Sequence, residues 1–480
     1  MSSSEKDKVM RLFALTPDNT PTHQLKIDTG HPLVEAFVIN GSLELVAQGQ
    51  NTIDKELPEG TYQVKFRAGN SVTEQWVELT QDRDILPETI PVPDSSMPSE
   101  NTWSDKEREV SEQFIVRHKL AVIIRDPEHE ITPSDKVSIR SLEGDTLVQT
   151  RNERPNAPGW EVLTDSPVVG LGGPAEPGPY LLRVSTPDIG TYEMIIWVSQ
   201  NYKTRVYLTR KYAAAWKIKR RTPHLGSATV HMVLRDDLDT KSQRRSELAE
   251  IIFTALQEER SLLISEEITE ALQGKCENVM LGLLAAHMLH IHIKNSSAST
   301  QSEEEIKEIE NLRQSLKSAI LNLDKLIPGC PDVGALGIAY GVDLQDINYG
   351  IPPMLAQSWT IIAAAEKSLL VPIGSYASRI SPALTAVRPW LVWRTNQLLR
   401  PSVVDNNLMG NEMKNLYELQ DQIKNEGPVA SNYLSNLLAT TNLDQYKTVQ
   451  ELAQSIGFPS CSLKSFIIQK QPVQKQEKKP

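Results

Sequence analysis

The chain has few of the features that would place a protein outside the cell or in a membrane. Its 480 residues include only three cysteines, Cys276, Cys330 and Cys461. They are far apart and odd in number, which predicts a reducing, cytoplasmic compartment rather than a disulfide framework. The N-terminus lacks the apolar stretch of a signal peptide. The most apolar run, 279–293, is too short to span a bilayer and contains three histidines, which predicts a buried helix and no membrane partner.

Positive charge is also in short supply. The chain has 50 lysine and arginine residues against 61 aspartate and glutamate residues, a formal net charge of −11. This excess of negative charge favours solubility and argues against a protein that binds nucleic acid with its whole surface. A hydrophobic content of 39% is typical of a soluble globular protein. The length is enough for about three domains at roughly 150 residues each.

The N-terminal half contains a near-repeat. Residues 58–66 (PEGTYQVKF) are echoed by residues 177–184 (PGPYLLRV). Each copy is a Pro/Gly turn, a tyrosine and an alternating strand, followed by a second alternating strand at 72–79 or 192–198. Alternation turns one face of each strand to a core and the other to water. The repeat predicts two β-sandwich-like modules, 25–81 and 113–239, the second ending in a basic connector.

Turn signals and composition define the remaining parts of this half. Asn40-Gly41 predicts a hairpin between strands at 34–39 and 43–48, because both residues tolerate a positive φ. Segment 82–112 is rich in proline and acidic residues, which predicts a linker. Segment 155–179 is rich in glycine and proline, and we predict a long rim loop there that forms a candidate binding edge.

From residue 240 the apolar period becomes helical. Amphipathic stripes start near Leu248, Leu281 and Ile306, and shorter helices are expected at 331–340, 352–369, 374–394, 411–423, 429–438 and 448–456. The predicted fold class is therefore multidomain, with two small all-β modules followed by an all-α domain over 240–465. Segments 1–24 and 466–480 are polar and are predicted to be flexible tails.

Two histidines of the apolar helix are weak metal candidates. His287 and His290 are three residues apart and share a helix face. Zinc needs three or four convergent ligands, and the sequence contains no HExxH or CxxC motif. A helix packed in the domain core explains the same pattern, so no cofactor is predicted. A hydrolase-type site in the helical domain would have to use His287, His290, Cys330 or Asp332, and this alternative stays open.

A basic segment at 203–221 is a candidate partner-binding region. Aromatic residues, among them Trp216, are interleaved with its basic residues, which could bind a phosphate backbone and stack on bases. The acidic character of the whole chain favours the other interpretation, in which the segment docks on an acidic protein partner or on the acidic segments 81–112 or 303–310 of this chain. Its basic residues are Lys203, Arg205, Arg210, Lys211, Lys217, Lys219, Arg220 and Arg221.

Trp390 and Trp393 are a second partner-binding candidate. They lie three residues apart on the helix predicted at 374–394. Aromatic residues at this spacing are usually packed in a core. They would also suit a groove for a partner helix.

Two parts of the sequence resemble known families. Residues 57–64 (LPEGTYQV) resemble the strand and turn of PEGA-like and carboxypeptidase-regulatory-like β-sandwich domains, which implies a non-catalytic adaptor module. Residues 281–287 (LGLLAAH) and 328–333 (PGCPDV) resemble uncharacterised bacterial proteins associated with caspase-like or CHAT-type protease signalling and defence operons. That resemblance implies an accessory component and not the protease itself.

The sequence favours a non-enzymatic adaptor or scaffold that mediates protein–protein interactions. The repeated β modules and the absence of a convergent catalytic motif carry this expectation. A caspase-like protease is the partner class that the resemblance implies. The two alternatives are a hydrolase-type enzyme with a site in the helical domain and a nucleic-acid-sensing subunit that uses the 203–221 segment.

Overall fold

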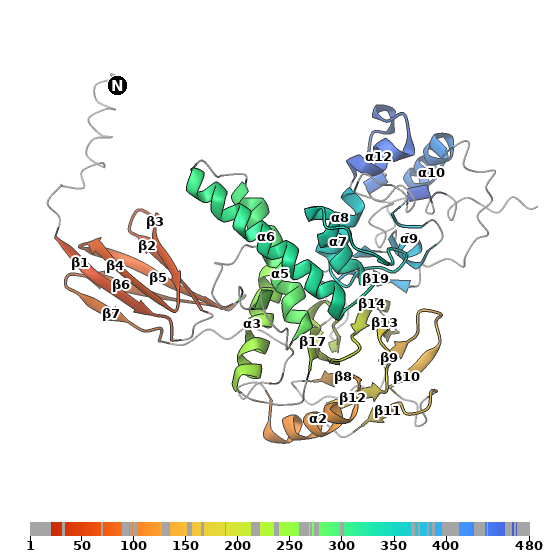
Figure 1. The fold of residues 1–480 in the computed structure, drawn as a ribbon, viewed down its shortest axis with the longest axis horizontal. Helices are drawn as coiled ribbons and strands as arrows, with labels where there is room; N and C mark the ends of the chain where they lie inside the picture. The colour runs from red at the N-terminus through yellow and green to blue at the C-terminus, as the bar shows by residue number, and fades with distance from the viewer. Residues whose placement is uncertain are drawn as a thin grey trace, which may run out of the picture. The chain divides into compact units, whose positions relative to one another are not determined.

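The computed structural model divides into two compact units, residues 1–94 with 263–265 and the remainder of the chain (Figure 1). It describes residues 21–395 with gaps at 31–33, 69–70, 89–95, 97, 99–102, 127–134, 151–155, 165–167, 188, 213–220, 235–239, 259–267, 269–270, 273–277, 298–301, 366–369, 373–374, 382–383 and 386–388. Further on it describes residues 412–426, 437–438, 440–456, 463–464 and 467.

The first unit is a β-sandwich of two sheets. One has the strand order β4-β1-β7 and the other β3-β2-β5-β6. One hydrophobic core joins them, with Leu25 and Ile27 from the first sheet and Val38, Val64 and Phe66 from the second. The strands are β1 (Thr22–Asp28), β2 (Glu35–Asn40), β3 (Leu45–Gln50), β4 (Thr52–Pro58), β5 (Gly60–Ala68), β6 (Ser71–Leu79) and β7 (Arg83–Ile85).

The near-repeat in the sequence corresponds to a repeated hydrogen bond. The Tyr62 hydroxyl donates to the carbonyl of Pro58 at 2.7 Å, and the Tyr180 hydroxyl donates to the carbonyl of Glu176 at 3.1 Å. In each copy the tyrosine ties the start of a long strand to the turn four residues before it. Each of these strands then forms an antiparallel hairpin with the next strand, β5 with β6 and β13 (Gly178–Thr186) with β14 (Gly190–Val198).

The second unit begins with two further sheets. Their strand orders are β10-β9-β13-β14-β19-β18 and β11-β12-β8-β15-β16, and β17 also pairs with β15. Helix α2 (Asp105–Arg117) packs on the second sheet through Phe114 and Ile115, which contact Ala121 and Ile123. The remaining strands are β8 (Leu120–Arg125), β9 (Lys136–Arg140), β10 (Thr146–Gln149), β11 (Glu161–Leu163), β12 (Val168–Gly173), β15 (Lys203–Tyr212), β16 (Arg221–Pro223), β17 (Thr229–Val233), β18 (Leu384–Thr385) and β19 (Val392–Arg394).

Helices predominate after β17, as the sequence predicts, with the short strands β18 and β19 among them. The chain is thus multidomain, β-rich first and helical afterwards. A short 3₁₀ helix η1 (Leu225–Ser227) lies among the strands, and η5 (Leu443–Gln445) lies near the C-terminus. The α-helices of this part are α3 (Thr240–Gln257), α5 (Val279–Ser297), α6 (Glu303–Leu326), α7 (Pro331–Tyr340), α8 (Ala356–Ala364), α9 (Tyr376–Ile380), α10 (Glu412–Glu426) and α12 (Val449–Ser455).

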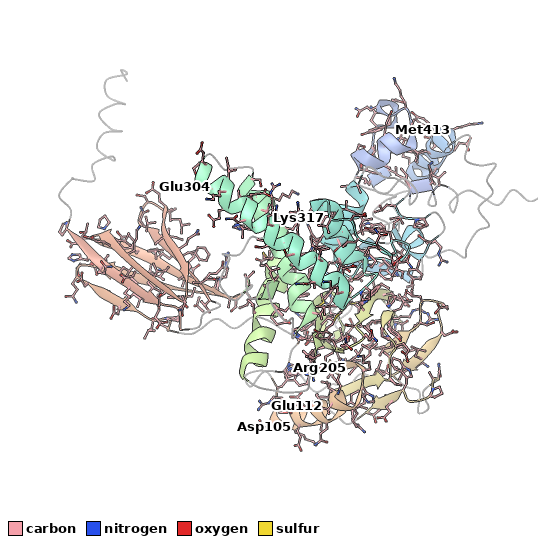
Figure 2. All side chains as sticks on the ribbon, in the orientation of Figure 1. Asp105, Glu112, Arg205, Glu304, Lys317 and Met413 are labelled. Atoms are coloured by element: carbon pink, nitrogen blue, oxygen red, sulfur yellow. The ribbon has the colours of Figure 1, made fainter. Side chains whose placement is uncertain are left out.

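Helix α5 is the centre of the helical part. It is apolar on nearly every side and contacts α3, α6, α7 and β17. Helix α6 beside it is amphipathic and begins with a capping box, in which Ser302 and Glu305 each bind the other's backbone N–H. Its charged positions include Glu304 in the first turn and Lys317 further along (Figure 2). No described helix is both long and apolar enough to cross a membrane.

The segment 82–112, predicted to be a linker, contains strand β7 and most of helix α2. The helix predicted at 374–394 is wrong: α9 is short, and strands β18 and β19 follow it and extend the sheet of β14. The rim loop predicted at 155–179 contains two strands, β11 and β12, that pair within a sheet. The helix predicted at 429–438 lies almost wholly outside the described residues.

Candidate functional site

Four side chains that carry chemistry meet in the interior of the helical part. They are His287 of α5, Cys330 and Asp332 at the start of α7, and Ser358 of α8. All four are fully buried. The sequence alternative of an enzyme names three of them, and the structure brings these three together. Ser358 was missed, because a lone serine in an apolar helix gives no sequence signal.

The Asp332 carboxylate holds the cluster together. It accepts hydrogen bonds from the backbone N–H groups of Met354 and Leu355 at 2.7 and 2.9 Å. It also accepts the Ser358 hydroxyl at 2.6 Å and the Cys330 thiol at 3.6 Å. Leu355 is the N-cap of α8, so the carboxylate satisfies one donor at the start of that helix and the N–H of the residue before it.

The hydrogen-bond order fixes the tautomer of His287. The Ser358 hydroxyl has one proton and donates it to Asp332, so its oxygen accepts from His287 Nε2 at 3.0 Å. The ring therefore carries its proton on Nε2. Burial lowers the pKa of His287 to about 3, which keeps the ring neutral. Its Nδ1 has no hydrogen-bond partner among the described residues.

The same burial acts on the two acidic groups. It raises the pKa of Asp332, although the hydrogen bonds from Ser358, Met354 and Leu355 work in the opposite direction. Burial, followed by the nearby Asp332 charge, raises the pKa of the Cys330 thiol well above its usual value. The thiol is therefore protonated and a poor nucleophile.

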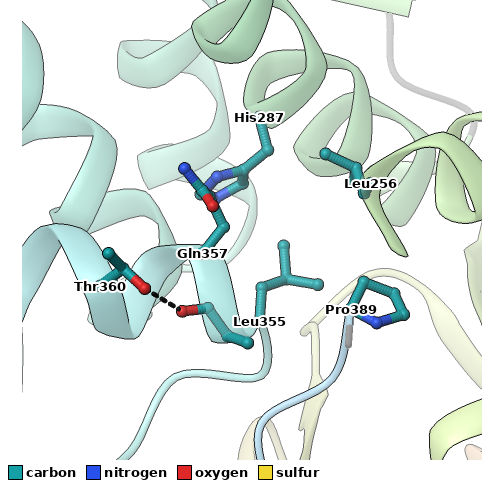
Figure 3. Close-up of a pocket in the computed structure, with 7 residues that line it drawn as sticks. Leu256, His287, Leu355, Gln357, Thr360 and Pro389 are labelled. Atoms are coloured by element: carbon teal, nitrogen blue, oxygen red, sulfur yellow. Dashed lines mark hydrogen bonds between the residues drawn. The ribbon is translucent and has the colours of Figure 1, made fainter. Parts of the chain in front are cut away.

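A small pocket reaches one member of the cluster. Its volume is about 10 Å³, room for about one water molecule. Figure 3 shows His287 and Gln357 among the side chains that line it, and the Thr360 hydroxyl donates to the Ala356 carbonyl at 3.1 Å. The pocket is lined by Leu256, His287, Leu355, Ala356, Gln357, Thr360 and Pro389.

The order of residues in the cluster differs from that of a hydrolytic triad. A triad places histidine between the acid and the serine, so that the imidazole takes the proton of the nucleophile. Here serine lies between acid and histidine, and its proton is held by Asp332. The arrangement joins α5, α7 and α8 through hydrogen bonds. It does not prepare Ser358 or Cys330 for nucleophilic attack.

The two histidines proposed as metal ligands have separate partners. His287 contacts Ser358, whereas His290 Nδ1 lies 3.1 Å from the Tyr340 hydroxyl. Within the part of the chain that the structure describes, no three His, Cys, Asp or Glu side chains are arranged to hold a metal ion.

Several basic side chains of the 203–221 segment form ion pairs or hydrogen bonds inside the second unit. Arg210 pairs with Asp135 at 2.8 Å and Arg221 with Asp126 at 2.7 Å, and all four side chains are buried. The Lys203 ammonium donates to the Val116 carbonyl. Intramolecular docking is therefore observed, on aspartates that the sequence did not single out. Arg205 and Lys211 lie on β15, and the residues Trp216, Lys217, Lys219 and Arg220 lie outside the described residues.

The tryptophan pair belongs to the core. Trp390 and Trp393 are fully buried, so the expectation of an exposed groove is wrong. The Trp390 indole N–H donates to the Ala228 carbonyl at 2.7 Å. The Trp393 N–H donates to the buried carboxylate of Glu193 at 3.1 Å. Glu193 also accepts from Tyr376 at 2.9 Å and lies opposite Arg183 in the β13–β14 hairpin.

An open apolar row crosses the second sheet of the first unit. Leu45 pairs with Ile39, Ile39 with Gln63, and Gln63 with Trp76, so these four residues stand side by side on one face of strands β3, β2, β5 and β6. The opposite face faces the core. Leu45 is 54% exposed and Trp76 is 66% exposed. Three of the four, Leu45, Ile39 and Trp76, are apolar, whereas Gln63 between Ile39 and Trp76 donates a hydrogen bond to Glu74 at 2.7 Å. We call Leu45, Ile39 and Trp76 the apolar row.

The hairpin beside this row presents another leucine. Leu43 has a φ of 64° and is 80% exposed. A positive φ is strained for leucine, so the turn must hold it. The Asn40 side chain does this by accepting the backbone N–H groups of Ser42 and Glu44, each at 2.9 Å. The predicted hairpin is confirmed, but the left-handed residue is Leu43 and not Gly41.

Comparison with known proteins adds little. No family model matches the chain, and no curated protein matches it. One solved structure that matches part of it is the Bacillus anthracis TIE protein, with 14% sequence identity, a TM-score of 0.15 and 38% of this chain covered. The chain spans about a third of that structure's length, 32%. A TM-score this low supports no inference about fold or function.

Proposed function

We propose that the protein is a non-enzymatic adaptor that binds a protein partner through the open sheet face of its first unit. The apolar row is the observation that carries this proposal. Large apolar side chains on the open face of a sheet lose contact with water when a partner covers them. Tryptophan is among the residues that dominate the binding energy of protein interfaces.

The reactive side chains in the interior of the second unit also support the proposal, because they are engaged in structural contacts. The described residues best suited to chemistry, His287, Cys330, Asp332 and Ser358, are buried and bonded to one another. Glu193 and the Arg210–Asp135 pair are likewise occupied inside the fold. These groups hold elements together, which is the role expected in a scaffold.

Purification of the tagged full chain from its native host tests the proposal. The wild type is compared with Trp76→Glu, and recovered proteins are quantified by mass spectrometry. Ile306→Glu is the matched control, because Ile306 is also apolar and exposed, at 58%, and lies on α6 of the second unit. We expect a stoichiometric partner with the wild type and the control that Trp76→Glu loses. Equal recovery in all three would contradict the proposal.

A caspase-like or CHAT-type protease is the first partner class to test. The only support for it is the resemblance of residues 281–287 and 328–333 to proteins of such systems. Recovery of such a protease in the same purification would establish the pathway. Recovery of a different partner would retain the adaptor function and reject this assignment.

A further inference from the structure

Acidic side chains surround the apolar row. Glu74 and Glu78 flank Trp76 on β6, two residues away on either side and therefore on the same face. Glu44 lies in the chain between Leu43 and Leu45, at the other end of the row, and is exposed. The apolar row thus has carboxylates at both ends.

The basic side chains of this face are already paired. Lys65 contacts Glu74 at 2.9 Å, and Arg67 contacts Glu35 at 3.0 Å. The Arg67 guanidinium also lies over the Phe37 ring, 4.5 Å from its centroid. The face therefore offers a partner little free positive charge, while Glu44 and Glu78 remain exposed beside the row.

The first unit as a whole carries an excess of negative charge. Between residues 21 and 86 the sequence has ten acidic and five basic residues. A field of one sign attracts partners of the opposite charge and repels anionic ones, such as nucleic acid or an anionic membrane surface.

The dimensions of the row suit one helix. Four neighbouring strands span roughly 14 Å, at about 4.8 Å between strands. Apolar residues at positions i, i+3 or i+4, and i+7 of a helix cover about 10 Å of its length. Lysine or arginine residues on the flanks of such a helix would lie close to Glu44 at one end and Glu78 at the other.

We propose that the occupant of the apolar row is a cationic amphipathic helix of a protein partner. Its apolar side chains would cover Leu45, Ile39 and Trp76, and its basic side chains would pair with Glu44 and Glu78. This inference rests on the proposed adaptor function and specifies the chemistry of the partner.

Fluorescence anisotropy with a defined probe tests this inference on the full chain. The probe is a labelled 18-residue peptide of leucine and lysine in helical amphipathic order, and its analogue has glutamate in place of every lysine. We expect Trp76→Ala, and Glu44→Lys combined with Glu78→Lys, each to weaken binding of the lysine peptide at least tenfold. Ile306→Glu should leave binding unchanged, and added salt should weaken it.

Several results would overturn the inference. They are equal or tighter binding of the glutamate peptide, no binding of either peptide, or lysine-peptide binding that survives both sets of substitutions. These results leave the adaptor function to be judged by the purification experiment. A partner lost by Trp76→Glu, together with Trp76-dependent binding of the glutamate peptide, would show that the face binds a partner of the opposite chemistry.

Discussion

Ser358 donates its hydroxyl proton to Asp332 Oδ1 at 2.6 Å, in a place where both side chains are fully buried. This bond determines which groups of the surrounding cluster donate hydrogen bonds and which accept them. It leaves the serine oxygen as an acceptor for His287 and gives the carboxylate its fourth donor beside Met354, Leu355 and Cys330. Ser358 and Asp332 therefore act as links between helices.

Removal of these links should lower stability. We expect Ser358→Ala to lower the free energy of unfolding by about 1–3 kcal/mol, since it leaves a buried carboxylate and a buried ring N–H each short of a partner. Asp332→Asn should cost more, because its amide N–H₂ would face backbone donors. Urea unfolding followed by circular dichroism measures both. Thr360→Ala, on an exposed position of the same helix, should stay within about 0.5 kcal/mol of wild type. Equal losses at Ser358 and Thr360 would contradict this account.

Two buried histidines should make stability depend on pH. Burial lowers the pKa of His231 and of His287 to about 3, from the usual histidine value of 6.5. Above pH 6.5 both rings are neutral in the folded and unfolded chain, so they add no pH dependence. Between about pH 6.5 and 3 the unfolded chain binds more protons, so stability falls as pH falls, by up to about 2.7 kcal/mol per pH unit for the pair.

Urea unfolding between pH 7 and 5 checks this dependence, in a range where most carboxylates remain ionised. We expect a loss of stability as pH falls in wild type and a shallower loss in His287→Gln. A wild-type stability that is flat over this range would show that neither ring has a lowered pKa in the folded state.

Cys330 should react slowly with electrophiles. Its thiol is fully buried, and burial together with Asp332 keeps it protonated. We expect alkylation by iodoacetamide at pH 7.5 to be negligible in the folded chain and rapid in 6 M guanidinium. Peptide mapping separates Cys330 from Cys276 and Cys461, which lie outside the described residues. Rapid labelling of Cys330 in the folded protein would instead favour the enzyme alternative.

The ion pair between Arg210 and Asp135 should be structural. Arg210→Met leaves the buried Asp135 carboxylate without this partner and should cost about 3–5 kcal/mol of unfolding free energy. Lys136→Met, at an exposed neighbouring position, should change stability by less than about 0.5 kcal/mol. Equal effects of the two substitutions on stability would indicate that Arg210 is exposed to water. A phosphate-binding role for the 203–221 segment would then have to be reconsidered.

The sequence was sufficient for most elements with a clear apolar period. The sequence predicts helix α7 at its observed bounds, Pro331–Tyr340. In the structure proline opens this helix and Gly341 ends it with a positive φ. Strands β5 and β6 and their hairpin followed from alternation. These signals are local, so no knowledge of distant contacts was needed.

The errors arose where distant residues decide the local structure. The sequence predicts a loop at Gly172 and Gly173, yet they lie in β12, which pairs with β8, and His118 and Trp160 pack closely against them. A Cβ atom at these positions would lie 2.5 Å from His118 and 2.3 Å from Trp160. The helix predicted around Trp390 failed for a similar reason, since β19 pairs with β14, about 200 residues earlier.

In the candidate sites, too, the sequence predicts local features but not contacts between distant residues. The sequence named His287, Cys330 and Asp332 but could not place Ser358 between them, since that contact joins separate helices. The exposure of Trp76 follows from its position on β6, but the row that it forms with Ile39 and Leu45 depends on strand order.

Photo-crosslinking in the native host tests the central claim most directly. The full chain carries p-benzoylphenylalanine in place of Leu43, beside the apolar row, or in place of Ile306 as the control. We expect one crosslinked protein partner from position 43 that disappears when Trp76→Glu is added, and no such product from position 306. Crosslinking from position 43 to no protein, or to the same proteins as from position 306, would contradict the central claim.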